Sequence, residues 1–316
     1  MKNSLRTIRW LPYVTLLWFF GCCGLLLPSL ISAESTPRIL LINSDASVTK
    51  YKESQEAFKQ VITQPIAEVD LGDKQWERSN IEDFLYDEDP DIMYCIGTKA
   101  YLLASKYAPK KNIVFSSIIN WLRLPITDKT YGVSNELHAG MEMTLFRLIF
   151  PNVQKIGVLY SKKYTEEWFK NAQNQAKEMG VEIIGQAITN KKQKVSAVKK
   201  LLPTVNAFWL VSDPELMSTK EDLLTILQEC AAQKTPVFSY HETFAELGAT
   251  FTVSVDDPTI GRQAAGIVTG VLSGDKLDNK VQFPAGTYTV LNLKKVKEYG
   301  LQYNEGALDT INRIIQ

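Results

Sequence analysis

The segments RILLINS (38–44), PIAEVDL (65–71) and DIMYCIG (91–97) are short, apolar and rich in β-forming residues. Between them, residues 52–62 and 80–86 have the mixed polar and apolar pattern of surface helices. Strands that alternate with helices in this way are typical of a parallel sheet covered by helices on both faces. The sequence therefore predicts an α/β fold from its first hundred residues onward.

The pattern continues with a helix at 99–107 and the strand NIVFSSI (112–118), where we expect the first sheet to end. A second series of the same kind follows TYGVSNELHAG (130–140). Its predicted helices and strands are 139–150, KIGVLYS (155–161), 166–179, VEIIGQAI (181–188), 195–202, AFWLVSD (207–213), 220–233 and TPVFSY (235–240). The rest of the chain adds a strand, a helix, a strand and a helix. Two Rossmann-like lobes with parallel-type central sheets follow from this repetition.

A length of 316 residues also favours two domains. We expect a signal segment at 1–33, a first lobe from 34–134 plus about 242–280, and a second lobe from 135–241 plus about 281–316.

The N-terminus has the layout of an export signal, since Lys2, Arg6 and Arg9 precede an uncharged apolar run from Trp10 to about Ile31. We place cleavage after Ala33. The mature protein would then lie in the periplasm or on the outer face of the cytoplasmic membrane.

Two alternatives remain for this segment. The apolar run approaches the length that spans a bilayer, so it can stay as an anchor that keeps the protein at the membrane. Gly21-Cys22 can also be a lipoprotein cleavage point, although Phe19 stands where an aliphatic residue is expected.

Charge and cysteine content exclude several function classes. Without Lys2, Arg6 and Arg9 the chain has 32 basic and 35 acidic residues, a net charge of −3, which disfavours nucleic acid as a partner. Cys95 and Cys230 are the cysteines left after cleavage, and their spacing favours neither a disulfide nor a zinc-type metal site.

Motifs for catalysis and for cofactors are absent from the sequence. It contains no GxGxxG after a strand, no GxxxxGK[ST] and no GxSxG, so we expect neither a cofactor nor an enzyme. The two histidines, His138 and His241, have no nucleophile motif beside them. As catalytic candidates we disfavour both, and we interpret His241 as a hydrogen-bonding loop residue and His138 as a structural residue at a helix start. Adjacent Asp256 and Asp257 suggest acid–base work, but one of them is expected to cap the helix that Pro258 starts, and either can accept a ligand ammonium.

Candidate ligand residues follow the strands. Thr98 opens a helix after an apolar strand, so its hydroxyl and the neighbouring amides can receive a carboxylate; alternatively Thr98 is an ordinary helix cap. Trp121 can cover an apolar part of a ligand or pack between the lobes. Further polar side chains at strand ends are Ser116, Ser117, Asn120, Tyr160, Ser161, Ser212, Asp213, Tyr240 and His241.

From about Arg38 to Leu308 the sequence resembles the type I periplasmic-type substrate-binding proteins of ABC transporters, in the subfamily that includes binders of aromatic amino acids. The matching segments, in order, are IGTKA (96–100), YGVSNE (131–136), FPNVQKIGVLYS (150–161), PVFSYHETFAELGAT (236–250), VSVDDPTIGRQAAGIVTGVLSGD (253–275) and LNLKKVKEYGL (291–301).

This resemblance implies a Venus-flytrap architecture with three lobe crossings, a small-molecule ligand between the lobes, no catalysis, and a permease with its ATPase as partners. The ligand residues that it implies are Ser44, Asp45, Gly97, Thr98, the loop 116–121, Tyr160, Ser212, Asp213, Tyr240 and Asp256. One departure concerns the ligand: Asn120-Trp121 stands where the subfamily often has Asp-Pro.

We therefore predict an extracytoplasmic solute-binding component of an ABC-type uptake system, for an amino acid or a related carboxylate. The alternative is a ligand-sensing module that signals through a partner protein, which a retained N-terminal anchor would favour. An enzyme would depend on His241 and the Asp256-Asp257 pair alone.

Overall fold

The structure is a computed structural model that describes residues 36–72 and 78–316. The predicted signal segment and both alternatives for it lie outside these residues. Within the described part of the chain, every helix is too short or too polar to cross a bilayer.

The first lobe is built on a six-stranded sheet with the order β11-β5-β4-β3-β1-β2. The register pairs all neighbouring strands in parallel. The strands are β1 Ile39–Asn43, β2 Ile66–Asp70, β3 Ile92–Ile96, β4 Asn112–Ile118, β5 Thr130–Ser134 and β11 Val281–Gln282. Its helices are α1 Thr49–Val61, α2 Arg78–Glu88, α3 Thr98–Tyr107 and α9 Asp257–Ser273, with the short 3-10 helix η1 Trp121–Arg123.

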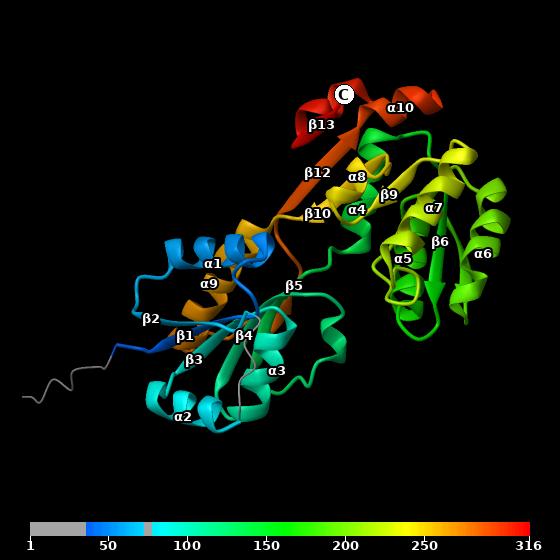
Figure 1. The fold of residues 1–316 in the computed structure, drawn as a ribbon. Helices are drawn as coiled ribbons and strands as arrows, with labels where there is room; N and C mark the ends of the chain where they lie inside the picture. Colours follow the sequence, from blue (N-terminus) through cyan, green and yellow to red (C-terminus); the bar gives the residue numbers. More distant parts are fainter. Residues whose placement is uncertain (1–35, 73–77) are drawn as a thin grey trace, which may run out of the picture. The chain divides into compact units, whose positions relative to one another are not determined.

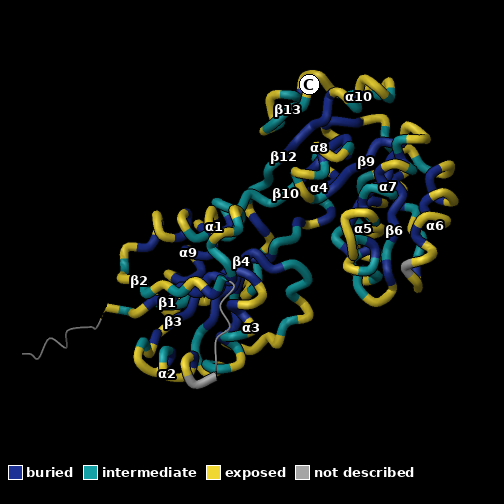
Figure 2. The backbone as a smooth tube through the Cα atoms, in the orientation of Figure 1, coloured by how far each residue is buried: buried dark blue, intermediate teal, exposed yellow. Residues whose placement is uncertain are grey.

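Strand β1 shows why these apolar runs form a sheet with two covered faces. Successive side chains on a strand point to opposite faces. Ile39 and Leu41 pack with α1 and α9, whereas Leu40 and Ile42 pack with α2 and α3. Figure 1 shows the two pairs of helices on opposite sides of this sheet, and the central strands β1 and β3 between them are buried in Figure 2.

The second lobe is built on a seven-stranded sheet with the order β13-β12-β10-β9-β8-β6-β7. Its pairs are parallel except for β10 with β12. The strands are β6 Lys155–Ser161, β7 Glu182–Ile188, β8 Ala207–Trp209, β9 Val237–Ser239, β10 Phe251–Val255, β12 Thr287–Asn292 and β13 Arg313–Ile315.

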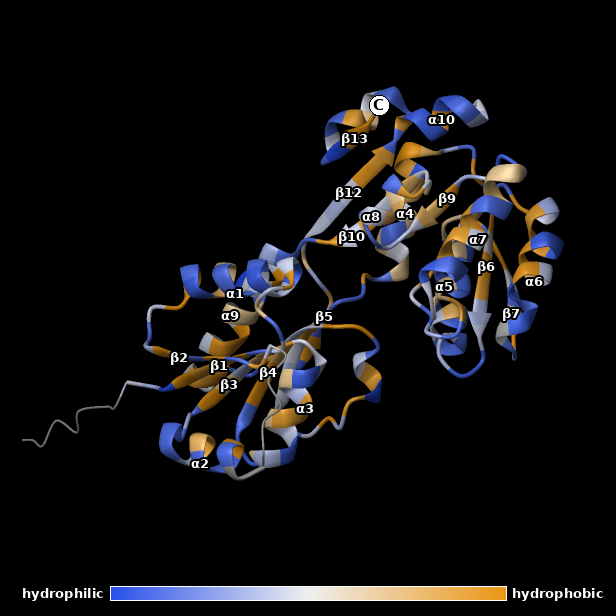
Figure 3. Ribbon diagram, viewed as in Figure 1, coloured by the Kyte–Doolittle hydropathy of each residue, from blue (hydrophilic) through white to orange (hydrophobic). Residues whose placement is uncertain are grey.

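The helices of this lobe bury one continuous apolar core against the sheet, with an aromatic centre in which Phe146 stacks on Phe238 at 4.5 Å between ring centroids. Figure 3 shows apolar residues along strands such as β3 and β9, while the helices carry both polar and apolar residues. The helices are α4 Ala139–Ile149, α5 Glu166–Glu178, α6 Lys194–Leu201, α7 Lys220–Ala232, α8 Thr243–Glu246 and α10 Leu293–Tyr299, with the 3-10 helices η2 Lys191–Gln193, η3 Leu202–Thr204 and η4 Glu305–Thr310.

The predicted α/β fold with two lobes and parallel-type sheets is thus confirmed. Three segments connect the lobes: 135–138 between β5 and α4, Asp256 between β10 and α9, and 283–286 between β11 and β12. Two helix boundaries lie where the sequence predicts them. Asp256 caps the start of α9, and Gly180, directly after α5, has a φ of +70°.

Two boundaries differ from the expectation. The first sheet does not end at 118, because β5 continues it by pairing with β4. Residues 243–255 belong with the second sheet and not with the first lobe, since β10 pairs with β9 and β12. The chain returns to the first lobe at α9 and remains there through β11.

Candidate functional site

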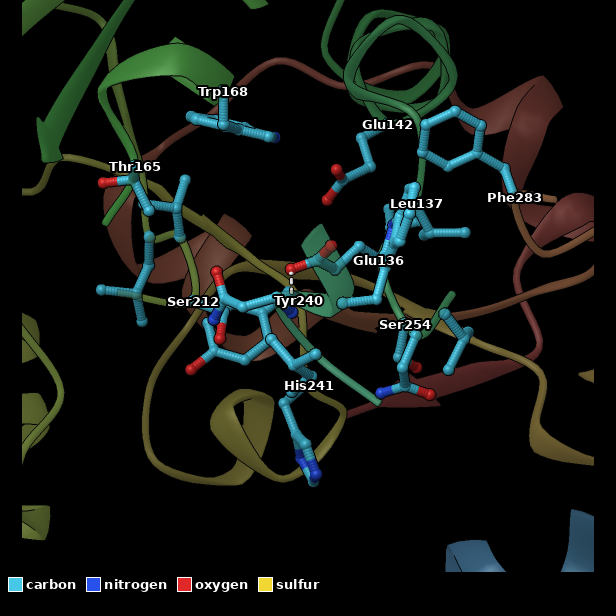
Figure 4. Close-up of a pocket in the computed structure, with 18 of the residues that line it drawn as sticks. Glu136, Leu137, Glu142, Thr165, Trp168, Ser212, Tyr240, His241, Ser254 and Phe283 are labelled. Atoms are coloured by element: carbon cyan, nitrogen blue, oxygen red, sulfur yellow. Dashed lines mark hydrogen bonds between the residues drawn. The ribbon is translucent and has the colours of Figure 1, made fainter. Parts of the chain in front are cut away.

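A cleft with a volume of 1470 Å³ is lined by both lobes and by the connecting segments. The first lobe contributes the start of α1 and the region of η1. The second lobe contributes the start of α5 and the ends of strands β8 to β10. The cleft therefore lies where carboxyl ends of parallel strands and helix starts meet, which is where ligands bind in open α/β sheets. Figure 4 shows part of its lining.

Two carboxyl groups, those of Glu136 and Glu142, face this cleft from the connecting segment and the first turn of α4. Glu142 is 6% exposed. Burial and repulsion from Glu136 raise its pKa well above the usual value, and a side-chain hydrogen bond with Trp209 opposes this.

Glu136 is half-buried, and its Oε1 accepts a hydrogen bond of 2.8 Å from the backbone N–H of Asn120. Burial raises its pKa, while this hydrogen bond and the charge of Arg123 lower it. The charge of each of these two acids therefore affects the other at the cleft.

Aromatic side chains form much of the remaining wall. Trp168 on α5 meets the buried ring of Trp209 edge to face at 4.9 Å between centroids. Phe283, Tyr240 and Tyr288 line the same cleft. Burial raises the pKa of Tyr240, although its hydrogen bond with Ser212 lowers it. Such a lining suits a ligand with a flat or apolar part.

A second acidic position is Asp257 at the start of α9. Its Oδ1 is buried without a hydrogen-bond partner. Burial raises its pKa to about 7, with Lys50 as the opposing charge. Burial in turn lowers the pKa of Lys50.

Arg123 links η1 to the loop before α5. Its guanidinium lies 3.9 Å from the centre of the Tyr164 ring, and it donates a hydrogen bond of 3.1 Å to the carbonyl of Lys163.

In the described part of the chain, no group of three or more His, Cys, Asp or Glu side chains is arranged to hold a metal ion. Cys95 and Cys230 are buried free thiols.

Seven of the residues predicted from the sequence line the cleft: Asn120, Trp121, Ser212, Tyr240, His241, Asp256 and Asp257. Trp121 also packs on Phe115 at 6.4 Å between centroids, so it serves the first lobe's core as well. The carboxylate of Asp256 accepts from the Thr259 N–H at 3.0 Å, which is the expected helix cap. His241 accepts from the Thr243 hydroxyl at 2.9 Å if Nδ1 is unprotonated.

The predicted anion site at Thr98 does not line the cleft. Thr98 is exposed, and the helix amide of Ala100 donates to the hydroxyl of Ser44 at 3.0 Å. Gly97 has a φ of +83°, and a β-carbon there would lie 2.7 Å from the Ser44 hydroxyl. The loop after β1 thus packs against the start of α3, where a ligand was expected.

The other predicted residues are held by protein contacts away from the cleft lining. The carboxylate of Asp213 accepts from the N–H and the hydroxyl of Ser161 at 2.8 and 2.7 Å. Tyr160 stacks on Phe169 at 4.2 Å. The hydroxyl of Ser117 lies 3.3 Å from that of Ser54, and Asp45 accepts from Ser47.

Sequence reasoning missed Glu136, Glu142, Trp168 and Trp209. A signal for Glu142 does exist: it lies four and seven residues before Phe146 and Ile149, on the same face of α4, and both of those are buried. An acid on the apolar face of a helix is unusual, because burial penalises its charge.

Solved structures share this fold. One is an ABC domain in complex with L-Trp from Streptococcus pneumonia, with 19% identity, a TM-score of 0.59, and coverage of 89% of this chain and 100% of that one. Another is a ligand-free, open substrate-binding protein with adhesive properties from Clostridium difficile, with 16% identity, a TM-score of 0.67, and coverage of 88% and 99%. A conserved domain protein from Vibrio cholerae has 18% identity, a TM-score of 0.59, and coverage of 88% and 99%.

Among curated proteins, none matches the chain. The family of ABC transporter substrate binding proteins, however, matches residues 40–314, which include both lobes and the whole cleft. The family binds solutes and is not an enzyme family. With its type I periplasmic-binding fold, the chain belongs to the ABC transporter substrate-binding proteins.

Proposed function

We propose that this protein is the extracytoplasmic solute-binding component of an ABC-type uptake system, and that it captures a small organic solute with an aromatic or apolar part. An amino acid is the leading example. The observation that carries the proposal is the cleft between the lobes, where aromatic walls surround a few polar groups.

The chemistry of the lining supports such a solute. Trp168, Tyr240 and Phe283 offer ring faces and edges, and Ser212 and Ser254 offer hydroxyls. A related fold binds L-Trp, which is a solute with one ring system and two charged groups. Closure of the two lobes around the solute would give a permease and its ATPase one shape to recognise.

The cleft, and not the start of α3, is the proposed location of the ligand. The hydroxyl of Ser44 already satisfies the amide of Ala100 at that helix start. Lys50 and Arg123 line the cleft, and their positive charges suit the carboxylate of an amino acid.

Native mass spectrometry of gently purified protein tests this function. We expect one small organic molecule per chain, which denaturation releases for identification, and a thermal shift when the same compound is added back. A protein that arrives empty and shows no thermal shift with amino acids, amines, carboxylic acids, sugars or nucleosides would refute solute capture.

The same measurement separates uptake from the sensing alternative. A mass that lacks residues 1–33 indicates a released carrier, as proposed, whereas a full-length chain extracted only with detergent would favour an anchored sensor.

A further inference from the structure

We propose that the cleft selects an organic cation, above all a primary amine, by seating the charged group against Glu142 and Glu136; this rests on the proposed function, because it names the solute class of the same cleft.

Glu142 is a buried acid without a cationic partner. Its side chain is 6% exposed, and among the described residues no lysine, arginine or histidine forms an ion pair with it. The interactions that act on it are burial, repulsion from Glu136 and the hydrogen bond with Trp209. A buried acid normally has a counter-charge or metal, since desolvation otherwise disfavours its ionised form. Here the carboxyl group that lacks a counter-charge faces the ligand cleft.

Figure 4 shows the carboxyl group of Glu142 pointing from α4 into the cleft, between the positions of Trp168 and Glu136 in this view. Glu136 adds a second carboxyl group at the same place, and its Oε1 is held by the N–H of Asn120 at 2.8 Å. Two carboxyls that repel one another are both relieved when a single ammonium enters between them.

The aromatic wall fits the same ligand. Trp168 and Trp209 meet edge to face beside Glu142, and Phe283 and Tyr240 line the cleft with them. Ring faces attract cations, and the attraction grows when water is excluded. An amine attached to an aromatic or aliphatic body would satisfy both the acids and the rings.

A solute with only a carboxylate fits poorly at this place, because its charge would face Glu136 and Glu142. Arg123 is engaged with the ring of Tyr164 and the carbonyl of Lys163, and Lys50 acts on Asp257. These cations can accept the second group of an amino acid. The proposed site therefore requires the ammonium, and it accepts a carboxylate only as a second group on the same solute.

Protons should accompany binding. Burial and Glu136 raise the pKa of Glu142, so at any pH below that pKa an incoming ammonium replaces the proton of this carboxyl. The affinity for an amine then rises with pH up to the raised pKa and levels off above it. Glu136 is the charged group that acts on Glu142 directly, and His138 is the N-cap residue of α4. The other charged groups that line the cleft include Arg123 and the α5 residues Glu166, Glu167 and Lys170.

The test uses sets of compounds that share one carbon skeleton and differ in charge. The sets are tryptamine, L-tryptophan and indole-3-propionate; phenethylamine, L-phenylalanine and 3-phenylpropionate; and isoamylamine, L-leucine and 4-methylpentanoate, with neutral sugars and nucleosides added. Each is titrated calorimetrically into the wild-type protein, Glu142→Gln and the control Glu178→Gln. Glu178 is an exposed acid at the end of α5, outside the cleft.

We expect binding by members that carry an amine, and no binding by the matching carboxylates. Glu142→Gln should weaken amine binding by about 10- to 100-fold, the loss of one charged hydrogen bond, whereas Glu178→Gln should not change it. In buffers of different ionisation heat, the wild type should release protons on binding and Glu142→Gln should release fewer. Thermal unfolding of Glu142→Gln at or above the wild-type temperature would exclude misfolding as the cause.

Other outcomes separate the two proposals. Binding of a carboxylate or a neutral compound that Glu142→Gln leaves unchanged would overturn the cation assignment while solute capture stands. If no compound of any class binds, the proposed function fails and the cation assignment fails with it.

Discussion

Gly261 of α9 lies against the backbone carbonyl of Ser54 in α1, so closely that a β-carbon at position 261 would stand 2.1 Å from that oxygen. The contact joins two helices that cover the same face of the first sheet. It matters for the site because α1 and α9 both begin at the cleft, where they place Lys50 and Asp257.

Gly261→Ala should therefore destabilise the protein by about 2–4 kcal/mol, since a backbone oxygen cannot move aside as a flexible side chain can. Urea unfolding measures the change. Gly266 is the matched control: it lies on the exposed side of α9 with open space around it, and Gly266→Ala should stabilise by up to about 1 kcal/mol. Equal effects of the two substitutions would contradict the close packing.

Asp213 is predicted to serve the second lobe's stability and not ligand binding. It is 1% exposed and accepts hydrogen bonds from Ser161, Thr165 and the N–H of Glu215. Asp213→Ala would remove the buried acceptor that these donors share, at a cost of about 2–5 kcal/mol in the free energy of unfolding. Asp213→Asn should cost less, and the exposed Asp278→Asn nothing measurable. A folded Asp213→Asn protein with more than tenfold weaker solute binding would restore Asp213 as a ligand residue.

The order of strands and helices was predictable because it depends on local patterns. Fully buried strands such as ILLIN (39–43) are apolar except for their last residue. Helices are bounded by residues such as Pro258 at the start of α9 and Gly180 after the end of α5. The lobe boundary near residue 242 was not predictable, because the sequence of a strand such as β10 suits either sheet. Its pairing with β9 and β12 determines that it belongs to the second lobe.

The site was predictable only in part, for a related reason. Strand-end position singled out Asn120, Ser212 and Tyr240, and all three line the cleft. It could not show that Ser44 contacts the start of α3, since that contact depends on β1 and β3 being neighbours. A search of strand ends also could not find Glu142, because this residue lies on helix α4.

Thr98→Val tests the predicted ligand site that the structure places outside the cleft. Thr98 is exposed and does not line the cleft, so the substitution should leave solute affinity within about twofold of the wild-type value. Calorimetric titration of the identified solute measures it. A loss of tenfold or more would return the ligand to the start of α3.

Trp168→Ala should weaken binding of the same solute by about tenfold or more, because a large ring is removed from the cleft wall. Tyr86→Ala is the control, since Tyr86 is an aromatic residue on α2 that is 84% exposed and outside the cleft. Unchanged affinity in Trp168→Ala would mean that the solute occupies another part of the cleft.

The pH dependence of stability should reveal Asp257. Its pKa is raised to about 7 in the folded protein, first by burial and then by the nearby acids Glu53, Asp256 and Glu242, against the opposing charge of Lys50. In the unfolded chain the carboxyl titrates near 3.8. Between these values the unfolded state loses the proton while the folded state keeps it, so the group's stabilising contribution is complete below about pH 4 and is lost as pH rises to 7.

Asp257→Asn removes this titration, which has a slope of at most about 1.4 kcal/mol per pH unit. Relative to wild type, the variant should gain stability steadily from pH 4.5 to pH 7 and hold that gain at pH 8, as measured by urea unfolding at each pH. Glu142 titrates in the same direction, so the slope that remains in Asp257→Asn should fall again in the double variant with Glu142→Gln. A difference between Asp257→Asn and wild type that is the same at every pH would show that Asp257 is already ionised in the folded protein, and that Lys50 outweighs the burial of its unpartnered Oδ1.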